Sequence, residues 1–224
     1  MNEEEKVEKS ELLCSVRNAL ILTVLPWAVH TAGVMFDFNT NRYGLIPLEI
    51  TGLRGIFTMP FLHANWEHLI SNTPALFLLL FGLFLFYGGK AWRILLYLYL
   101  LSGALTWLMG RETTHIGASG LVYALAAFHF VSGVIKKEPR QRAFALLVAF
   151  LYGGFIWAFF PTLYFGTSIS WEGHLSGLLA GILFAFYYRQ EGPKPPVYPS
   201  LEEEDEEGEF QEETTSIDSI SSSS

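Results

Sequence analysis

The chain has 224 residues, of which 51% are hydrophobic and only 16% are charged. Soluble domains carry about 25% charged residues, so this composition excludes an ordinary soluble protein and indicates one membrane bundle of about six spans. The 14 Lys and Arg residues are scattered over short segments, which argues against nucleic acid as a partner. The lone Cys14 can form neither an internal disulfide nor part of a cysteine metal cluster.

The predicted elements are apolar helices joined by short charged turns. Residues 1–17 are polar and mostly acidic, unlike a cleaved signal peptide, and we expect a cytoplasmic segment ahead of a retained first span. Uninterrupted apolar windows predict an all-α membrane protein. The six predicted spans cover residues 18–36, 69–87, 94–110, 118–135, 143–163 and 172–188.

The distribution of Lys and Arg predicts the orientation of these spans. With a cytoplasmic N-terminus, eleven of the fourteen basic residues lie on the inner side, and only Arg42, Arg54 and Arg111 lie outside. By the positive-inside rule, both termini of this multi-pass integral membrane protein are then cytoplasmic. The long outer loop at 37–65 is rich in aromatic and apolar residues, so we expect it to insert partly into the membrane interface.

The composition changes after residue 190, where the predicted bundle domain of residues 18–190 ends. The chain becomes rich in Pro, then in Glu and finally in Ser. Residues 195–224 contain ten carboxylates and no Lys or Arg, and without them the formal net charge would change from −8 to +2. Such a segment cannot bury enough apolar area to fold. We expect residues 191–224 to be a disordered acidic and Ser-rich cytoplasmic tail.

Polar residues at membrane depth mark candidate functional sites, because burying them in hydrocarbon is costly. His68 and Asn72 are four residues apart, so they lie on one face of the second predicted span. His63 lies five residues before His68, and the segment lacks the two-histidine spacing and intervening glutamate of a zinc protease. We therefore expect no metal and no cofactor.

Ser119 and His174 form a candidate nucleophile and base. Ser119 lies in the segment HIGASG, where glycines let backbone amides approach a ligand and a helix N-terminus can stabilise an oxyanion. His174 precedes Gly177 and Gly181, whose spacing permits close packing against a neighbouring helix. If that neighbour carries Ser119, His174 can act as its general base and then as general acid. Tyr123, one turn after Ser119, could stack on the imidazole.

Each of these residues alone also has an ordinary structural explanation. A serine between glycines is a common helix-packing contact, and a single buried histidine is often a satisfied core residue. Asn72, His115 and His129 could each bridge two helices, and we assign no catalytic role to His115 or His129. The functional interpretation depends on the joint pattern.

Over approximately residues 50–188 the chain resembles the rhomboid intramembrane serine proteases. The resemblance rests on three segments, His63-x4-His68-x3-Asn72, Gly117-Ala118-Ser119-Gly120-x2-Tyr123 and His174-x2-Gly177-x3-Gly181. It implies a six-transmembrane-helix rhomboid-like bundle with Ser119 as nucleophile and His174 as its base. It also implies that His68, Asn72 and the Ser119 amide stabilise the oxyanion, that Gly117 shapes that site, and that Tyr123, Gly177 and Gly181 have supporting roles.

The resemblance implies an intramembrane serine endopeptidase that hydrolyses a peptide bond in or near the transmembrane helix of a protein substrate in the lipid bilayer. Aspartate and lysine are absent from the predicted spans, which excludes a membrane aspartyl dyad and disfavours a serine–lysine dyad. Two alternatives stay open, namely a non-catalytic rhomboid-like protein that binds transmembrane clients and a small-molecule transporter. Without organelle-targeting signals, the expected location is a bacterial plasma membrane.

Overall fold

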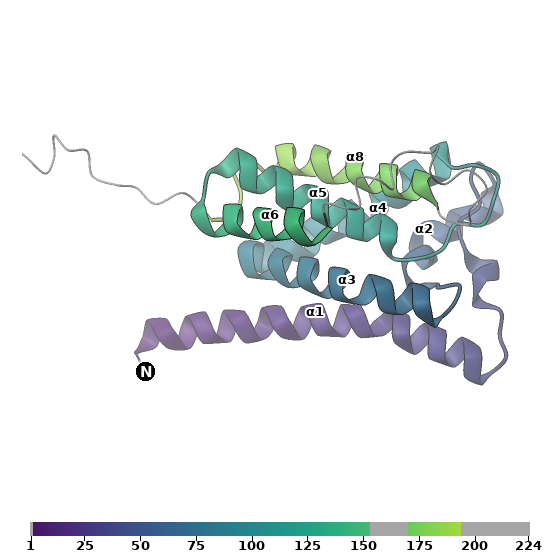
Figure 1. The fold of residues 1–224 in the computed structure, drawn as a ribbon, viewed down its shortest axis with the longest axis horizontal. Helices are drawn as coiled ribbons and strands as arrows, with labels where there is room; N and C mark the ends of the chain where they lie inside the picture. Colours follow the sequence, from purple (N-terminus) through teal and green to yellow (C-terminus); the bar gives the residue numbers. More distant parts are fainter. Residues whose placement is uncertain (1, 153–169, 194–224) are drawn as a thin grey trace, which may run out of the picture. The chain divides into compact units, whose positions relative to one another are not determined.

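The computed structural model describes residues 2–152 and 170–193, and within these ranges the protein is helical (Figure 1). One isolated antiparallel bridge, between Leu45 and His115, is the β-type pairing in the described ranges. The longer helices are α1 (Glu3–Met35), α3 (Trp66–Tyr87), α4 (Ala91–Met109), α5 (Ser119–Lys136), α6 (Pro139–Tyr152) and α8 (Trp171–Tyr187). The short helices are η1 (Thr40–Tyr43), η2 (Ile50–Arg54), α2 (Gly55–Thr58), η3 (Met59–Phe61) and η4 (Gly88–Lys90).

The first helix begins earlier than the predicted residue 18. The Asn2 side chain accepts the backbone N–H of Glu5 at 2.7 Å, and the Glu5 carboxylate accepts the backbone N–H of Asn2 at 3.0 Å. This capping box supplies partners for N–H groups that would otherwise have none, so α1 starts at Glu3. The other predicted spans agree with helices within a few residues, except that residues 153–163 of the fifth lie outside the described residues.

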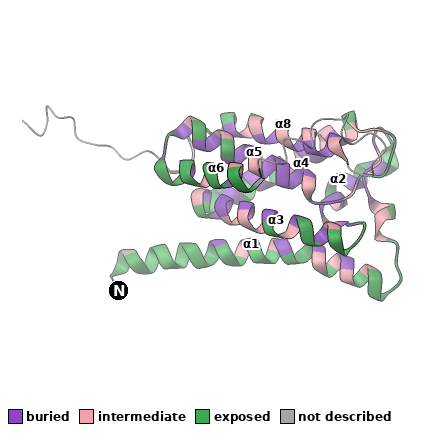
Figure 2. Cartoon of the chain, in the orientation of Figure 1, coloured by how far each residue is buried: buried purple, intermediate pink, exposed green. Residues whose placement is uncertain are grey.

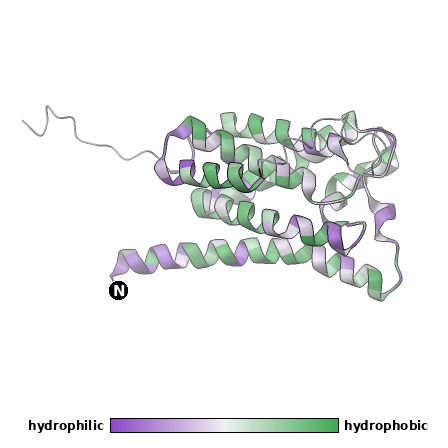
Figure 3. Cartoon of the chain, viewed as in Figure 1, coloured by the Kyte–Doolittle hydropathy of each residue, from purple (hydrophilic) through white to green (hydrophobic). Residues whose placement is uncertain are grey.

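Long apolar helices make this an integral membrane protein. In the described chain, three helical segments are long and apolar enough to cross a membrane, namely Glu5–Met35, Trp66–Met109 with its turn at η4, and Ser119–Lys136. Figure 2 shows that α1 is largely exposed, and Figure 3 shows that it is hydrophobic beyond its first turns. Leu20, Ile21 and Val24 on α1 are each at least half exposed. A bilayer offers such side chains an apolar solvent.

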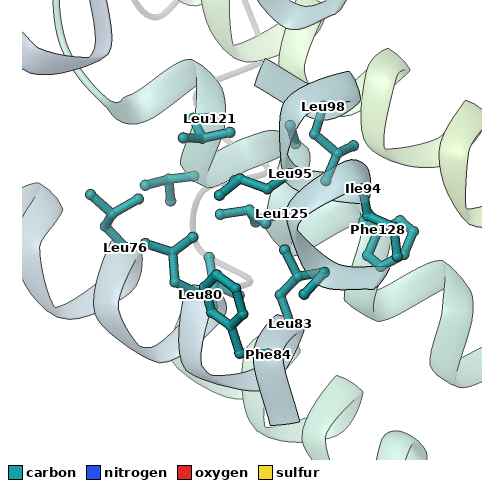
Figure 4. Close-up of a cluster of buried hydrophobic side chains, with 14 of the residues drawn as sticks. Leu76, Leu80, Leu83, Phe84, Ile94, Leu95, Leu98, Leu121, Leu125 and Phe128 are labelled. Carbon is teal, nitrogen blue, oxygen red and sulfur yellow. The ribbon is translucent and has the colours of Figure 1, made fainter. Parts of the chain in front are cut away.

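The core lies where α3, α4 and α5 meet (Figure 4). Leu83 of α3, Ile94 of α4 and Leu125 of α5 have no solvent-exposed surface in the structure. Such close packing leaves little freedom for a helix to shift, because a displaced side chain would have to leave a well-filled site. The core therefore holds α5, and with it Ser119, in a defined position.

Among the described helices, the most extensive pairing is between α5 and α8. A Cβ atom on Gly177 would lie 2.1 Å from the carbonyl oxygen of Gly120, and one on Gly181 would lie 2.3 Å from that of Ala124. Both distances are far below contact, so only glycine fits at these two positions of α8. The two backbones touch, which brings the first turns of α5 and α8 together.

Candidate active site

Ser119 and His174 meet at the adjoining N-terminal ends of α5 and α8. The distance between Ser119 Oγ and His174 Nε2 is 3.0 Å. His174 is buried and Ser119 is partly exposed, so the contact lies at the margin of the buried region. With His174 neutral and its proton on Nδ1, the Ser119 hydroxyl donates to Nε2. This is the arrangement in which a histidine can remove the proton of an attacking serine.

Tyr123 holds the imidazole from one side. Its ring stacks on that of His174, with centroids 4.2 Å apart and an angle of 17° between the planes. Because Tyr123 follows Ser119 by one turn of α5, the same helix carries the Ser119 hydroxyl and the ring that packs on the His174 imidazole. The structure therefore brings together Ser119, His174 and Tyr123, as well as the supporting glycines of α8.

Gly117 places the Ser119 segment against His68. Its φ is +113°, a conformation that residues with a side chain rarely adopt. A Cβ atom at Gly117 would lie 2.7 Å from Cε1 and 2.8 Å from Nε2 of His68. The imidazole thus packs directly on the Gly117 backbone, two residues before Ser119. Glycine is required there both by the backbone angle and by the space that His68 occupies.

Asn72 lies one turn further along α3 than His68 and is buried. Its Nδ2 donates to the backbone carbonyl oxygen of His68 at 2.9 Å. A carboxamide NH2 has two donors, so one hydrogen is held within α3 and the second remains for another acceptor. The backbone N–H of Ser119, at the first position of α5, likewise has no partner within its own helix.

Beyond the dyad, a polar network joins the segment before Ser119 to the start of α8. Ser170 caps α8 by accepting the Gly173 N–H at 3.2 Å, and its Oγ lies 2.6 Å from His115 Nδ1. Glu172 is buried and pairs with Arg111, with 3.4 Å between Arg111 Nε and Glu172 Oε1. Sequence reasoning missed Ser170, although a serine directly before an apolar helix is a common N-cap. His129, in contrast, binds the Leu79 carbonyl from α5 and so bridges two helices.

No set of three or more His, Cys, Asp or Glu side chains in residues 2–152 and 170–193 is arranged to hold a metal ion. His63 and His68 lie close together, with ring centroids 5.0 Å apart in an edge-on arrangement. Burial and the positive charge of His68 lower the pKa of His63, which precedes α3, to about 4. His63 is thus expected to stay neutral near pH 7.

We expect the folded protein to lose stability as the pH falls from 7 to 5, partly because of His63. Its pKa is about 4 in the folded state, against 6.5 for an exposed histidine, so between these values the unfolded state binds more protons. At pH 5 the difference corresponds to roughly 2 kcal/mol in favour of unfolding. The measurement is the melting temperature in detergent across this pH range. In His63→Leu the melting temperature should depend less steeply on pH, and an unchanged slope would contradict the prediction.

Comparison with known proteins finds similarity to one family over most of the chain. A family model described as a Rhomboid domain matches residues 51–191, which include every residue of the candidate site. Uncharacterized proteins of Mycobacterium bovis and Mycobacterium tuberculosis are 38% identical over 164 residues, which are 69% of this chain and 65% of theirs. An uncharacterized protein of Mycobacterium leprae is 34% identical over 173 residues, covering 75% of this chain and 68% of its own.

A protein of Acanthamoeba polyphaga mimivirus that is named a rhomboid protein is 24% identical over 133 residues, covering 57% of this chain and 71% of its own. The chain spans 65% of the length of the Mycobacterium bovis and Mycobacterium tuberculosis relatives.

Proposed function

Because the chain belongs to the rhomboid family, we propose that it is an intramembrane serine endopeptidase with Ser119 as nucleophile and His174 as base. The observation that supports this most directly is the 3.0 Å distance between Ser119 Oγ and His174 Nε2. Peptide hydrolysis by a serine requires a base within hydrogen-bond reach of the hydroxyl. The stacked Tyr123 ring favours an imidazole orientation that keeps Nε2 toward the serine.

The proposed reaction begins when His174 Nε2 takes the proton of the Ser119 hydroxyl and Oγ attacks the carbonyl carbon of the substrate. The negative charge that forms on the carbonyl oxygen is stabilised by the Ser119 N–H and by donors from His68 and Asn72. The C–N bond then breaks, and the leaving amine takes the proton from His174. Water then attacks the acyl carbon while His174 takes its proton. The bond between that carbon and Ser119 Oγ breaks as His174 returns the proton to Oγ, which releases the acid and restores Ser119.

In the membrane, we propose a bundle of six spans, formed by residues 18–190, with both termini in the cytoplasm. The basic residues support this orientation, since eleven of fourteen lie in segments that it places inside. The site then faces the outer leaflet, beside the partly inserted loop at 37–65. An unwound substrate helix needs water and polar partners there, because hydrocarbon supplies neither. The mycobacterial relatives support a bacterial plasma membrane, and residues 191–224 would form a cytoplasmic tail.

The proposed substrates are proteins with a transmembrane helix, cut at small residues near helix-weakening positions. The test uses the purified full-length chain in liposomes with such a model substrate and, in parallel, a serine-directed fluorophosphonate. We expect substrate cleavage and labelling of the chain at one serine. Substrate binding without cleavage or labelling would contradict the proposal and favour a client-binding protein. Solute uptake without either would favour a transporter.

Removing the proposed oxyanion donor Asn72 should slow the chemical step. We expect Asn72→Ala to lower kcat by about 10² to 10³-fold with little change in KM, because the donor acts on charge that forms only in the transition state. The measurement is steady-state cleavage of the model substrate. Ser71→Ala is the matched control, since Ser71 Oγ also donates to the His68 carbonyl, at 2.9 Å. An unchanged kcat in Asn72→Ala, or an equal loss in Ser71→Ala, would remove Asn72 from this role.

A further inference from the structure

A second contact between a serine and a histidine lies four residues upstream of the dyad in both segments. His115 precedes Ser119 by four residues, and Ser170 precedes His174 by four residues. His115 Nδ1 and Ser170 Oγ are 2.6 Å apart. Both contacts join the segment entering α5 to the start of α8, with the two residue types exchanged. His115 is 1% exposed and Ser170 is partly exposed.

The partners of His115 determine the direction of each hydrogen bond. His115 Nε2 lies 3.1 Å from the carbonyl oxygen of Arg111, which can only accept, so Nε2 carries the proton. Burial lowers the pKa of His115 and favours the neutral ring, in which Nδ1 is then an acceptor. The Ser170 hydroxyl therefore donates to Nδ1, and its oxygen accepts the N–H of Gly173. The chain of bonds runs from Gly173 through Ser170 and His115 to Arg111, and each of its members is satisfied.

The backbone of His115 is held as firmly as its side chain. The His115 N–H donates to the Leu45 carbonyl at 2.7 Å, and the Leu45 N–H donates to the His115 carbonyl at 3.0 Å. Leu45 itself is fully buried. The His115 backbone is thus fixed to a buried part of the protein, and its imidazole contacts Ser170, the residue directly before α8.

Contacts therefore lie on both sides of His174 along α8. Ser170 is bound four residues before it, and Gly177 is packed against Gly120 three residues after it. Two separated contacts fix a helix against tilting and sliding better than one. A displacement of about 1 Å at a reacting group can cost about 100-fold in rate, so the Ser170 contact bears directly on the 3.0 Å dyad.

We propose that His115 and Ser170 are a positioning pair, which holds the first turn of α8 so that the His174 imidazole stays within reach of the Ser119 hydroxyl. This inference rests on the proposed function. Neither residue touches the reacting atoms, and both act through the position of His174. Their loss should thus lower the reactivity of Ser119 and kcat, while KM for the substrate stays the same.

Ser170→Gly is the sharpest variant. It removes the hydroxyl that binds His115 and Gly173, but glycine is nearly as good an N-cap as serine, so the loss of the Gly173 bond costs little and the loss of the His115 link dominates. The readouts are the rate of fluorophosphonate labelling of the full-length chain, kcat, KM and the melting temperature. We expect about a tenfold or larger loss in labelling rate and kcat for Ser170→Gly and for His115→Leu. The double variant should lose no more labelling rate or kcat than the worse single variant, since both substitutions remove the same contact between His115 and Ser170. Ser170→Thr keeps the hydroxyl and should stay within about threefold of the parent chain.

The matched control is His129→Leu, which removes a buried histidine on α5 whose Nε2 lies 2.9 Å from the Leu79 carbonyl. Its labelling rate should equal that of the parent chain. Parent-like labelling in folded Ser170→Gly, an equal loss in His129→Leu, or losses that multiply in the double variant would each overturn the positioning role. If the parent chain itself neither labels nor cleaves, the proposed function fails and the inference falls with it. A reactive parent with an unaffected Ser170→Gly rejects the inference alone.

Discussion

Replacing Ser119 by alanine is expected to abolish fluorophosphonate labelling and to lower substrate cleavage by about 10⁴-fold or more, with the fold unchanged. The hydroxyl is the proposed nucleophile, and its loss leaves no atom that can form the acyl-enzyme. Ser119 is partly exposed at the start of α5, so removing one oxygen creates no cavity in the core. The measurements are product formation, labelling and the melting temperature of the same preparation.

His174→Ala should lose activity to a similar extent, because an unassisted serine hydroxyl is a weak nucleophile. Residues that act as a unit are not additive, so the double variant of Ser119 and His174 should be no worse than either single variant. Ser132→Ala is the control, since Ser132 is a second serine on α5, buried and away from the first turn that carries Ser119, and it should label and cleave like the parent. Cleavage that persists in both Ser119→Ala and His174→Ala would reject the dyad.

Gly177→Ala should impair both stability and activity. The added Cβ would lie 2.1 Å from the Gly120 carbonyl oxygen and 3.0 Å from the Ala124 nitrogen. Both are backbone atoms of α5, and the buried core behind α5 leaves them no room to yield, so α8 has to move away. We expect a loss of roughly 2 to 4 kcal/mol in stability. Activity should also fall in the molecules that remain folded, because His174 lies on the displaced turn.

The measurements for Gly177→Ala are the melting temperature, resistance to protease and the labelling rate at a temperature where the variant remains folded. Gly89→Ala is the matched control, because a Cβ atom at Gly89 would meet nothing within 4 Å. It should leave stability and labelling unchanged. A Gly177→Ala chain with the stability and labelling rate of the parent would contradict the close contact between α5 and α8.

The helices themselves follow from local sequence, since an apolar window of about 20 residues is sufficient to identify a membrane-spanning helix. The predicted 69–87 and 172–188 agree with α3 and α8 within a few residues for this reason. The start of α1 was missed because hydropathy does not register a capping box. Asn2 and Glu5 have the spacing of that motif, so the signal was local and present in the sequence.

For the candidate site, the sequence predicted some residues and not others. Sequence alone was enough to single out Ser119 and His174 as candidates, because both occur with glycines that allow close helix packing and in a pattern shared with one family. It left each residue with a structural explanation as well. His115 was interpreted as a helix bridge and Ser170 was not noticed, since neither residue type indicates by itself which partner it will meet across 55 positions of chain.

Sequence by itself therefore determined that the helices lie in a membrane, where they approximately begin and end, and which chemical groups are available for a site. Those properties depend on composition and on neighbours a few residues away. Only the tertiary structure decided that a hydroxyl and an imidazole lie 3.0 Å apart, that His68 rests on the Gly117 backbone and that Ser170 meets His115. Such contacts depend on how α5 and α8 pack, and packing is set by the shapes of many side chains together, which no local pattern contains.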